Sequence, residues 1–168
     1  MNIKIDTSKP VLVTGATGFV GGWVVKGLIE KGVTVHAPIR DRDNKEKIKP
    51  LSDISDKGPG NIVFFEANLL DPNSYDEAMN NCEIVFHIAS PFLYNFNDAY
   101  KDFIEPAVQG TQNVLDSVNR TQTVKKVILT SSCTAIFGDH IDINSVPDKI
   151  LTEDIWNETS NEKHQPYS

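Results

Sequence analysis

The residues that first indicate chemistry are three glycines, Gly15, Gly18 and Gly21, which recur at three-residue spacing directly after a short apolar run. A strand over residues 11–13 that turns at Gly15 and enters a helix at Gly18 would direct free backbone N–H groups outward at the positive end of the helix dipole. Gly21 would let that helix lie close against the strand, because it has no Cβ. The stretch predicts a seat for a phosphate or a diphosphate.

The spacing of these glycines, G-x-x-G-x-x-G, is one residue longer than the common dinucleotide fingerprint. Glycines also occur in turns and helix caps for steric reasons alone, so the triplet by itself is a weak signal. Its place in the chain favours ligand binding, because it follows a predicted strand, opens a predicted helix and begins an alternation of strands and helices.

A second group of charged residues begins with Arg40, at the end of the strand predicted over residues 33–39. In a βαβ dinucleotide site this strand end meets the adenosine ribose, where a carboxylate accepts from a free 2′-hydroxyl and an arginine pairs with a 2′-phosphate. Arg40 precedes Asp41, and a guanidinium binds phosphate in a bidentate manner whereas a carboxylate repels it. This order favours NADP (NADPH) over NAD. Residues 42–46 also fit the solvated start of a helix, whichever cofactor binds.

These residues need a scaffold that brings strand ends together. Apolar and β-branched runs predict five strands, at residues 11–13, 33–39, 62–65, 84–89 and 126–132. The segments between them predict a helix that starts at Gly18 and stops at Gly32, a surface loop over 52–61, a short helix from Asp71-Pro72 to Met79, and a long helix that bends or starts late at Pro106.

Strands that alternate with helices require right-handed crossovers, and they predict an α/β fold with a doubly wound parallel sheet of the Rossmann type in the order 3-2-1-4-5. Ligands bind such sheets beyond the carboxyl ends of the strands. Pro38 lies near the end of the second strand, so pairing must finish there or leave that side unpaired. His87, inside the continuously apolar fourth strand, fits a core histidine better than a catalyst.

Composition narrows the classes of function. A chain of 168 residues fits one globular domain, and a net charge of −7 argues against nucleic acid or an anionic membrane as partner. No apolar run is long enough to span a membrane and the first ten residues lack a signal-peptide core, so a cytoplasmic location is expected. Cys82 and Cys133 lack metal-ligand spacing with the four histidines, so no metal site is expected.

Six segments carry a family resemblance: T-G-A-T-G-F-V-G at 14–21, I-R-D at 39–41, H-I-A-S-P at 87–91, P-A-V-Q-G-T-Q-N-V-L at 106–115, K-K-V-I-L-T-S-S at 125–132 and P-Y at 166–167. Together they resemble the extended short-chain dehydrogenase/reductases of the NAD-dependent epimerase/dehydratase superfamily. Within that family the chain is most similar to the branch of dihydroflavonol reductases, cinnamoyl-CoA reductases and aldehyde reductases. The resemblance implies an NAD(P)-binding Rossmann domain over residues 1–168, corresponding to about the first half of a typical member, with a sheet incomplete at its C-terminal side.

The resemblance implies roles for individual residues. Those implied to bind the cofactor are Gly15, Thr17, Gly18, Phe19, Val20, Gly21, Arg40, Lys47, Asn68, Leu69, Ala89, Ser90 and Pro91. Lys47 would assist Arg40 at the 2′-phosphate, and Leu69 and Ala89 would line the adenine and ribose walls. Asn68 stands where members usually have an aspartate near the adenine, so that contact is altered.

Ser132 and Tyr167 match the catalytic serine and tyrosine of the family. Reduction of a carbonyl by hydride from nicotinamide builds negative charge on oxygen, so one donor must polarise that oxygen and one acid must deliver a proton. Members place a lysine four residues after the tyrosine, where its charge favours the phenolate. The resemblance therefore implies an NADP-dependent oxidoreductase that reduces an aldehyde or ketone, with dihydroflavonol-like compounds among the candidate small-molecule substrates.

Two alternatives stay open at this point. A nucleotide-sugar epimerase or dehydratase shares the fold, the serine and the tyrosine, but such enzymes usually carry an acidic residue where this chain has Arg40. A noncatalytic module would use the dinucleotide seat without chemistry. Because the chain ends at Ser168, before the lysine, and leaves residues 127–129 as an apolar edge, we expect it to be inactive when made alone and to aggregate or form a homodimer.

Overall fold

The computed structural model describes residues 6, 8–91 and 95–166. Two compact units divide the chain, and each is described by itself. The sheet unit contains residues 1–90 and 109–130, and the second unit contains residues 91–108 and 131–168.

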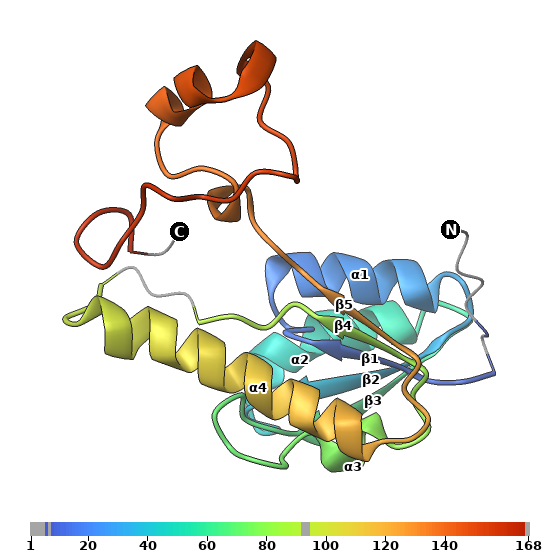
Figure 1. The fold of residues 1–168 in the computed structure, drawn as a ribbon. Helices are drawn as coiled ribbons and strands as arrows, with labels where there is room; N and C mark the ends of the chain where they lie inside the picture. Colours follow the sequence, from blue (N-terminus) through green and yellow to red (C-terminus); the bar gives the residue numbers. More distant parts are fainter. Residues whose placement is uncertain (1–5, 7, 92–94, 167–168) are drawn as a thin grey trace. The chain divides into compact units, whose positions relative to one another are not determined.

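Five parallel strands form the centre of the sheet unit: β1 (Val11–Thr14), β2 (Thr34–Ile39), β3 (Asn61–Glu66), β4 (Ile84–His87) and β5 (Lys126–Leu129). Their order is β3-β2-β1-β4-β5 (Figure 1). This confirms the predicted doubly wound parallel sheet and its strand order. Because every strand is parallel to its neighbours, their carboxyl ends share one edge of the sheet.

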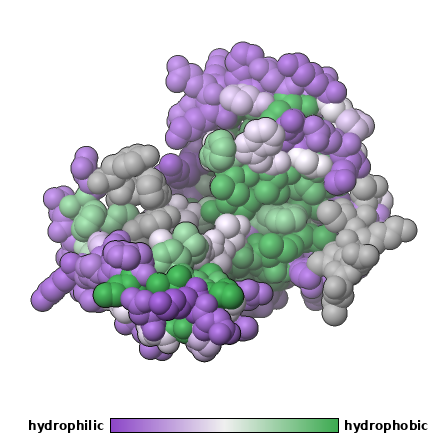
Figure 2. All heavy atoms as spheres, turned by 90° about the horizontal axis from the view of Figure 1, so that it is seen from above, coloured by the Kyte–Doolittle hydropathy of each residue, from purple (hydrophilic) through white to green (hydrophobic). Residues whose placement is uncertain are grey.

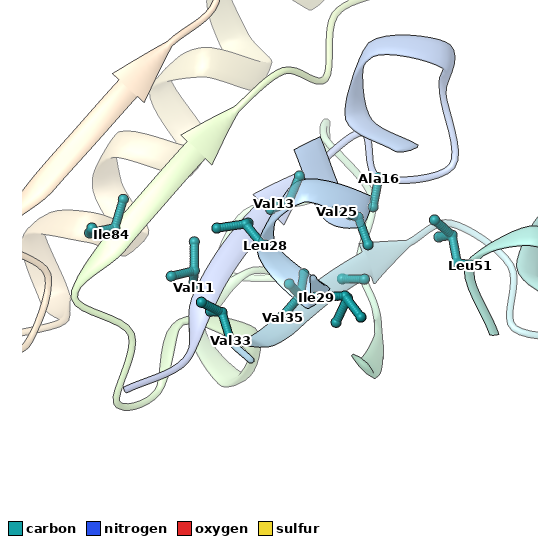
Figure 3. Packing of buried hydrophobic residues seen from close by; sticks show 11 residues of the cluster. Val11, Val13, Ala16, Val25, Leu28, Ile29, Val33, Val35, Leu51 and Ile84 are labelled. Atoms are coloured by element: carbon teal, nitrogen blue, oxygen red, sulfur yellow. The ribbon is translucent and has the colours of Figure 1, made fainter. Parts of the chain in front are cut away.

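Helices cover both faces of this sheet. The α1 helix (Phe19–Ile29) and the α2 helix (Lys45–Ser55) contribute to one apolar cluster, whereas the α3 helix (Asp76–Met79) and the α4 helix (Glu105–Arg120) contribute to the other. Figure 3 shows side chains of α1 directed toward the valines of β1 and β2. Val11 and Val13 belong to this first cluster and Leu12 to the second, because successive side chains of a strand point to opposite faces.

The prediction of a surface loop over residues 52–61 is wrong in its first part, because α2 continues to Ser55. Leu51 is buried in the first cluster and Ile54 packs against it, so tertiary burial holds this segment helical although Pro50 lies inside the helix. The following residues form turns up to Asn61, where β3 begins.

The prediction of a helix that starts at Asp71-Pro72 is also wrong. Turns occupy residues 71–75, and only Asp76–Met79 is helical. Asn73 adopts a left-handed conformation with φ of 64°, which interrupts the regular helical path. The long helix agrees better with expectation: α4 starts at Glu105, so Pro106 lies in its first turn, and a π-helical segment, η1 (Tyr100–Ile104), precedes it.

Strands β4 and β5 end earlier than predicted, at His87 and Leu129. After β4 the N–H groups of Ile88 and Ala89 donate to the hydroxyl of Thr14 instead of to a neighbouring strand. Pro38 lies within β2, which pairs with β3 as far as Ile39 but with β1 only at Val35 and His36. The proline therefore lies beyond the paired part of β2 on its β1 side, one of the two arrangements expected.

The described part of the second unit contains η1 and the first turn of α4, and its remainder, from Ser131 on, is largely irregular chain with the short 3₁₀ helices η2 (Cys133–Ala135), η3 (His140–Ser145) and η4 (Pro147–Lys149). Polar side chains organise it. The carboxylate of Asp142 accepts from the backbone N–H groups of Gly138 and Asp139 and from the hydroxyl of Thr159, at 3.0, 3.0 and 2.7 Å. The described segment after Phe137 thus contains loops and short turns.

Candidate functional site

The loop between β1 and α1 is a tight turn. Gly15 has φ of 68°, the left-handed region that glycine favours, and its carbonyl accepts from the N–H of Gly18 at 2.9 Å. Gly18 is extended and precedes the first helical residue, Phe19. Among the described residues no side chain caps this helix start, so its N–H groups remain available to a ligand.

Two glycines of this loop stand where the backbone comes too close for a side chain. A Cβ on Gly21 would collide with the carbonyl oxygen of Gly15 and lie 2.7 Å from its carbonyl carbon. A Cβ on Gly15 would lie 2.9 Å from the backbone nitrogen of Ala89, which follows β4. The loop is therefore held between the start of α1 and the end of β4.

Phe19 and Val20, the first residues of α1, are 84% and 51% exposed, and Trp23 on the next turn is 60% exposed. Figure 2 shows that apolar atoms gather at the surface in the view from above. The predicted cofactor contacts Phe19 and Val20 are thus accessible beside the glycine loop.

A hollow of about 290 Å³ lies at the end of β2, lined by Thr17, Ile39, Arg40, Asp41, Asn44, Lys47 and Ile48. It brings together Thr17 of the glycine loop, Arg40 after β2 and Lys47 in the first turn of α2. The side chain of Asn44 accepts from the backbone N–H of Lys47 at 3.2 Å, and this cap fixes where α2 begins.

The two cations of this hollow are not neutralised by contacts within the described chain. Arg40 and Lys47 are exposed, and neither side chain forms a hydrogen bond or an ion pair with a described residue. Asp41 is the one carboxylate in the described lining, and its Oδ1 accepts from the N–H of Asp43 at 2.8 Å. Burial raises the pKa of Tyr75 to about 12, and the positive charge of Arg40 acts in the opposite direction, so the guanidinium lies within electrostatic range of that phenol.

Asn68 and Leu69, the predicted adenine contacts, lie just after β3. Asn68 Oδ1 accepts from the N–H of Leu70 at 3.2 Å, which closes a local turn. The carbonyl of Leu69 accepts from Nδ2 of Asn113 at 3.0 Å, and Gly110 of α4 leaves space for the Leu69 side chain. Asn113 is 4% exposed and was missed from the sequence, although a polar residue beside Val114 on an apolar helix face was the available signal.

The side chain of Thr14, the first residue of the 14–21 segment, has contacts that the sequence did not predict. It is fully buried, and its Oγ1 accepts from the N–H groups of Ile88 and Ala89, both at 3.0 Å. His87 Nδ1 lies 2.8 Å from the same oxygen, and burial lowers the pKa of this imidazole, so the interpretation of His87 as a core histidine agrees with the structure. Ser90 is exposed at the end of this segment, and Pro91 belongs to the second unit.

Ser132 lies in the second unit, in a hollow of about 390 Å³ lined by Ser131, Ser132, Cys133, Ala135, Ile136, Glu153, Ile155 and Trp156. Its Oγ accepts from the backbone N–H and the hydroxyl of Thr134, at 3.2 and 3.0 Å. Both lone pairs of the serine oxygen are then occupied, and its own hydrogen is free to be donated. The predicted catalytic Tyr167 lies outside the described residues.

Within the described ranges no group of three or more histidine, cysteine or acidic side chains is placed to hold a metal ion. No helix in the same ranges is long and apolar enough to cross a bilayer. Both cysteines are free; Cys133 is exposed, whereas burial raises the pKa of Cys82 to about 12.

A parallel doubly wound sheet with a glycine turn after β1 and a cationic hollow after β2 defines a Rossmann-type unit. A sequence profile of the NAD dependent epimerase/dehydratase family matches residues 11–168. The chain belongs to this family.

Curated relatives are reductases by name. The chain is 39% identical over 125 residues to the bifunctional dihydroflavonol 4-reductase/flavanone 4-reductase of Pyrus communis, which covers 74% of this chain and 36% of the relative. It is also 39% identical over 134 residues to an anthocyanidin reductase ((2S)-flavan-3-ol-forming) of Vitis vinifera, covering 80% of this chain and 39% of the relative. These matches confirm the resemblance to the reductase branch, and the chain spans less than two fifths of the length of either relative.

Solved structures of reductases are also similar to this chain. Gre2 of Candida albicans in complex with NADPH is similar with a TM-score of 0.77 and 30% identity, over 95% of this chain and 48% of that one. Vestitone reductase from alfalfa (Medicago sativa) is similar with a TM-score of 0.66 and 32% identity, over 89% of this chain and 43% of that one.

Proposed function

We propose that this chain supplies the cofactor-binding part of an NADP-dependent oxidoreductase that reduces an aldehyde or ketone by hydride transfer. The observation that carries the proposal is the hollow after β2. Arg40 and Lys47 both line it, and neither forms an ion pair with a carboxylate of the described chain. A 2′-phosphate would supply the missing anion. The names of the relatives and the NADPH complex of Gre2 support the same class of reaction.

The glycine loop suits the other end of the cofactor. Its shape depends on the absence of Cβ atoms at Gly15 and Gly21, and it leaves the N-terminal N–H groups of α1 uncapped by described side chains. Backbone donors at a helix start, with the helix dipole behind them, stabilise a diphosphate. Thr17 of this loop also lines the hollow, so the proposed diphosphate and 2′-phosphate seats would adjoin.

The chemistry would divide between the cofactor and two side chains. Bound NADPH would supply hydride to the carbonyl carbon, while oxygen gains a proton and the carbonyl becomes an alcohol. Ser132 would donate a hydrogen bond to the carbonyl oxygen, since Thr134 already occupies the acceptor capacity of its Oγ. By resemblance, Tyr167 would deliver the proton.

One observation favours a second candidate. Asp41 lines the same hollow as Arg40, and a carboxylate there can accept from the 2′-hydroxyl of NAD. A chain that used Asp41 in this way would fit a nucleotide-sugar epimerase or dehydratase of the same family. A comparison of the affinities for NADPH and NADH therefore distinguishes the two proposed functions.

The experiment measures the dissociation constants of NADPH and NADH with the purified protein and with Arg40→Ala. Loss of a charge-assisted contact to phosphate should weaken NADPH binding by about tenfold or more and leave NADH within about threefold. Arg42→Ala is the matched control, because Arg42 is exposed and outside the lining of the hollow. Equal affinity of the unmodified protein for both cofactors would contradict the proposal.

A further inference from the structure

The hollow beside Ser132 lies between two segments of the second unit. Residues of 131–136 line one side of it, and residues of 153–156 line the other. Asn157 joins the two segments, because its backbone N–H donates to the carbonyl of Ala135 at 2.9 Å and its Nδ2 donates to the carbonyl of Thr134 at 2.8 Å. At about 390 Å³ the hollow is of a size that binds small molecules.

Apolar side chains form much of the lining. Ile136 contributes from the first segment, and Ile155 and Trp156 contribute from the second. Trp156 is 74% exposed, and its indole forms no hydrogen bond or ring contact with a described residue. An accessible indole can pack against the carbon skeleton of a ligand, and the electron-rich face of its ring attracts a cation.

Glu153 is the one carboxylate in the described lining, which contains no lysine, arginine or histidine. Its side chain is exposed and forms no hydrogen bond or ion pair with a described residue. The N–H of Ile155 donates to the carbonyl of Thr152 at 3.2 Å, and Glu153 lies within this turn. A carboxylate without a partner beside an apolar lining favours a ligand that is both positively charged and apolar.

Other carboxylates of this acidic segment are already engaged. Residues 138–166 contain seven acidic residues and two lysines. His164 Nε2 lies 2.5 Å from Asp139 Oδ2, and Asp142 accepts three hydrogen bonds, whereas Glu153 has no such partner in the described chain. The excess of negative charge raises the local concentration of cations, and Glu153 is the carboxylate that can receive one in the hollow.

We propose that this hollow binds carbonyl compounds that carry a positively charged ammonium group. The inference rests on the proposed function, since it takes the carbonyl of the substrate as the acceptor for Ser132. The hydroxyl of Ser132 would donate its free hydrogen to the carbonyl oxygen, Glu153 would attract the ammonium group, and Trp156 would contact both the carbon skeleton and the charge. The substrate class is then amino ketones and amino aldehydes.

The test compares two ketones of the same shape that differ in charge. The para-acetyl derivative of phenyltrimethylammonium carries a fixed positive charge, and para-tert-butylacetophenone has a neutral group of the same shape in its place. Binding is measured without cofactor, from the NMR shift of the indole N–H of Trp156, which is identified as the resonance lost in Trp156→Leu. We expect the cationic ketone to bind about fivefold more tightly than the neutral one.

Two substitutions should reduce this preference. Glu153→Gln should weaken the cationic ketone by about threefold to fivefold and leave the neutral ketone within about twofold, because an exposed charge contact is lost. Asp154→Asn is the matched control, since Asp154 is exposed, adjacent in sequence and outside the lining, and it should change neither affinity beyond about twofold. Trp156→Leu, followed by ligand NMR, should weaken the cationic ketone more than the neutral one, because leucine keeps apolar surface but has no aromatic face. Both Glu153 and Trp156 are exposed, so we expect these variants to fold.

Ser132→Ala tests the other end of the ligand. It should weaken both ketones by a similar factor of about threefold, because each loses the same hydrogen bond. Unchanged affinity would contradict the assignment of the carbonyl to Ser132.

Equal affinity of the unmodified protein for the two ketones would overturn the inference. An equal loss in Glu153→Gln and Asp154→Asn would overturn it as well, since the cation would then respond to net charge and not to the hollow. Failure of the unmodified protein to bind NADPH would instead overturn the proposed function, and the ketone titrations, which contain no cofactor, distinguish that result from failure of the inference.

Discussion

Replacement of Gly21 by alanine tests most directly whether the glycine loop works by close approach. The added Cβ would collide with the carbonyl oxygen of Gly15 and lie 2.7 Å from the Gly15 carbonyl carbon and 2.9 Å from Ala16 Cα. All three atoms belong to the backbone of the turn, so no side-chain rotation relieves the clash. Either α1 moves away from β1 or the turn opens.

The expected magnitude follows from this geometry. Overpacking that forces a backbone shift costs about 1–3 kcal/mol, and Gly21→Ala should lower the free energy of unfolding by that amount. On the proposed function, displacement of the turn would also weaken NADPH binding by about tenfold or more, because the backbone N–H groups of the loop would no longer all point toward the diphosphate.

Gly27→Ala is a matched control in the same helix. Apart from the adjoining backbone of its own helix, a Cβ at Gly27 would meet no atom of the described chain within 4 Å, so the substitution adds a methyl group without a clash. Alanine is a better helix former than glycine, and Gly27→Ala should raise the free energy of unfolding by about 0.5–1 kcal/mol with NADPH affinity unchanged.

The assay is urea unfolding of the three proteins without cofactor, followed by NADPH titration under conditions where each is folded. Opposite signs of the change in unfolding free energy for the two substitutions would support the reasoning. Equal stability of Gly21→Ala and Gly27→Ala would refute it, since the distances from the two added methyl groups to their neighbours would then have no consequence.

Two further predictions concern the core and the surface. Burial lowers the pKa of His87 from its ordinary value of about 6.5, so the unfolded chain takes up a proton that the folded chain does not. The free energy of unfolding should therefore fall below about pH 6.5, by up to about 1.4 kcal/mol per pH unit from this residue, and urea unfolding of His87→Gln should show a flatter pH dependence. Arg120 of α4 forms a two-point ion pair with Asp76 of α3 at 3.0 and 2.8 Å, but the side chains are 44% and 39% exposed. Arg120→Ala should therefore cost less than about 1 kcal/mol, a loss that shrinks in high salt; a cost above about 2 kcal/mol at low salt would contradict this.

The order of the strands could be predicted because apolar and β-branched runs locate each strand and each crossover has one favoured hand. The extent of α2 could not. The Ser, Asp, Gly and Pro residues of 52–61 predict a surface loop, whereas burial of Leu51 and packing of Ile54 against the first cluster extend the helix to Ser55. Tertiary packing overrides local preference at such places.

The residues of the candidate site also differ in whether the local sequence indicates them. Gly15 and Gly21 could be recognised because local spacing already indicates a turn before a helix, and Arg40 because a strand end can be located. Thr14 and Asn113 act through partners far along the chain. Thr14 accepts from a residue 75 positions later, and Asn113 donates to one 44 positions earlier. No local pattern encodes such contacts, so these two residues became visible only with the fold.

On the proposed function, the residues that line the hollow after β2 give a physical reason why this site would bind NADP and disfavour NAD. Arg40 and Lys47 place two positive charges beside one carboxylate, in a chain whose net charge is −7. A 2′-phosphate, with about −1.5 to −2 charges at neutral pH, would offset the excess. A 2′-hydroxyl would displace water from both cations without replacing the lost hydrogen bonds with charge-assisted ones, which is unfavourable. Discrimination would then come from the cost of the wrong ligand together with the gain from the right one. Removal of Arg40 should therefore narrow the difference between the cofactors by weakening NADPH binding about tenfold or more and by improving NADH binding within about threefold, and a larger improvement for NADH would show that Asp41 had been restrained by its cationic neighbour.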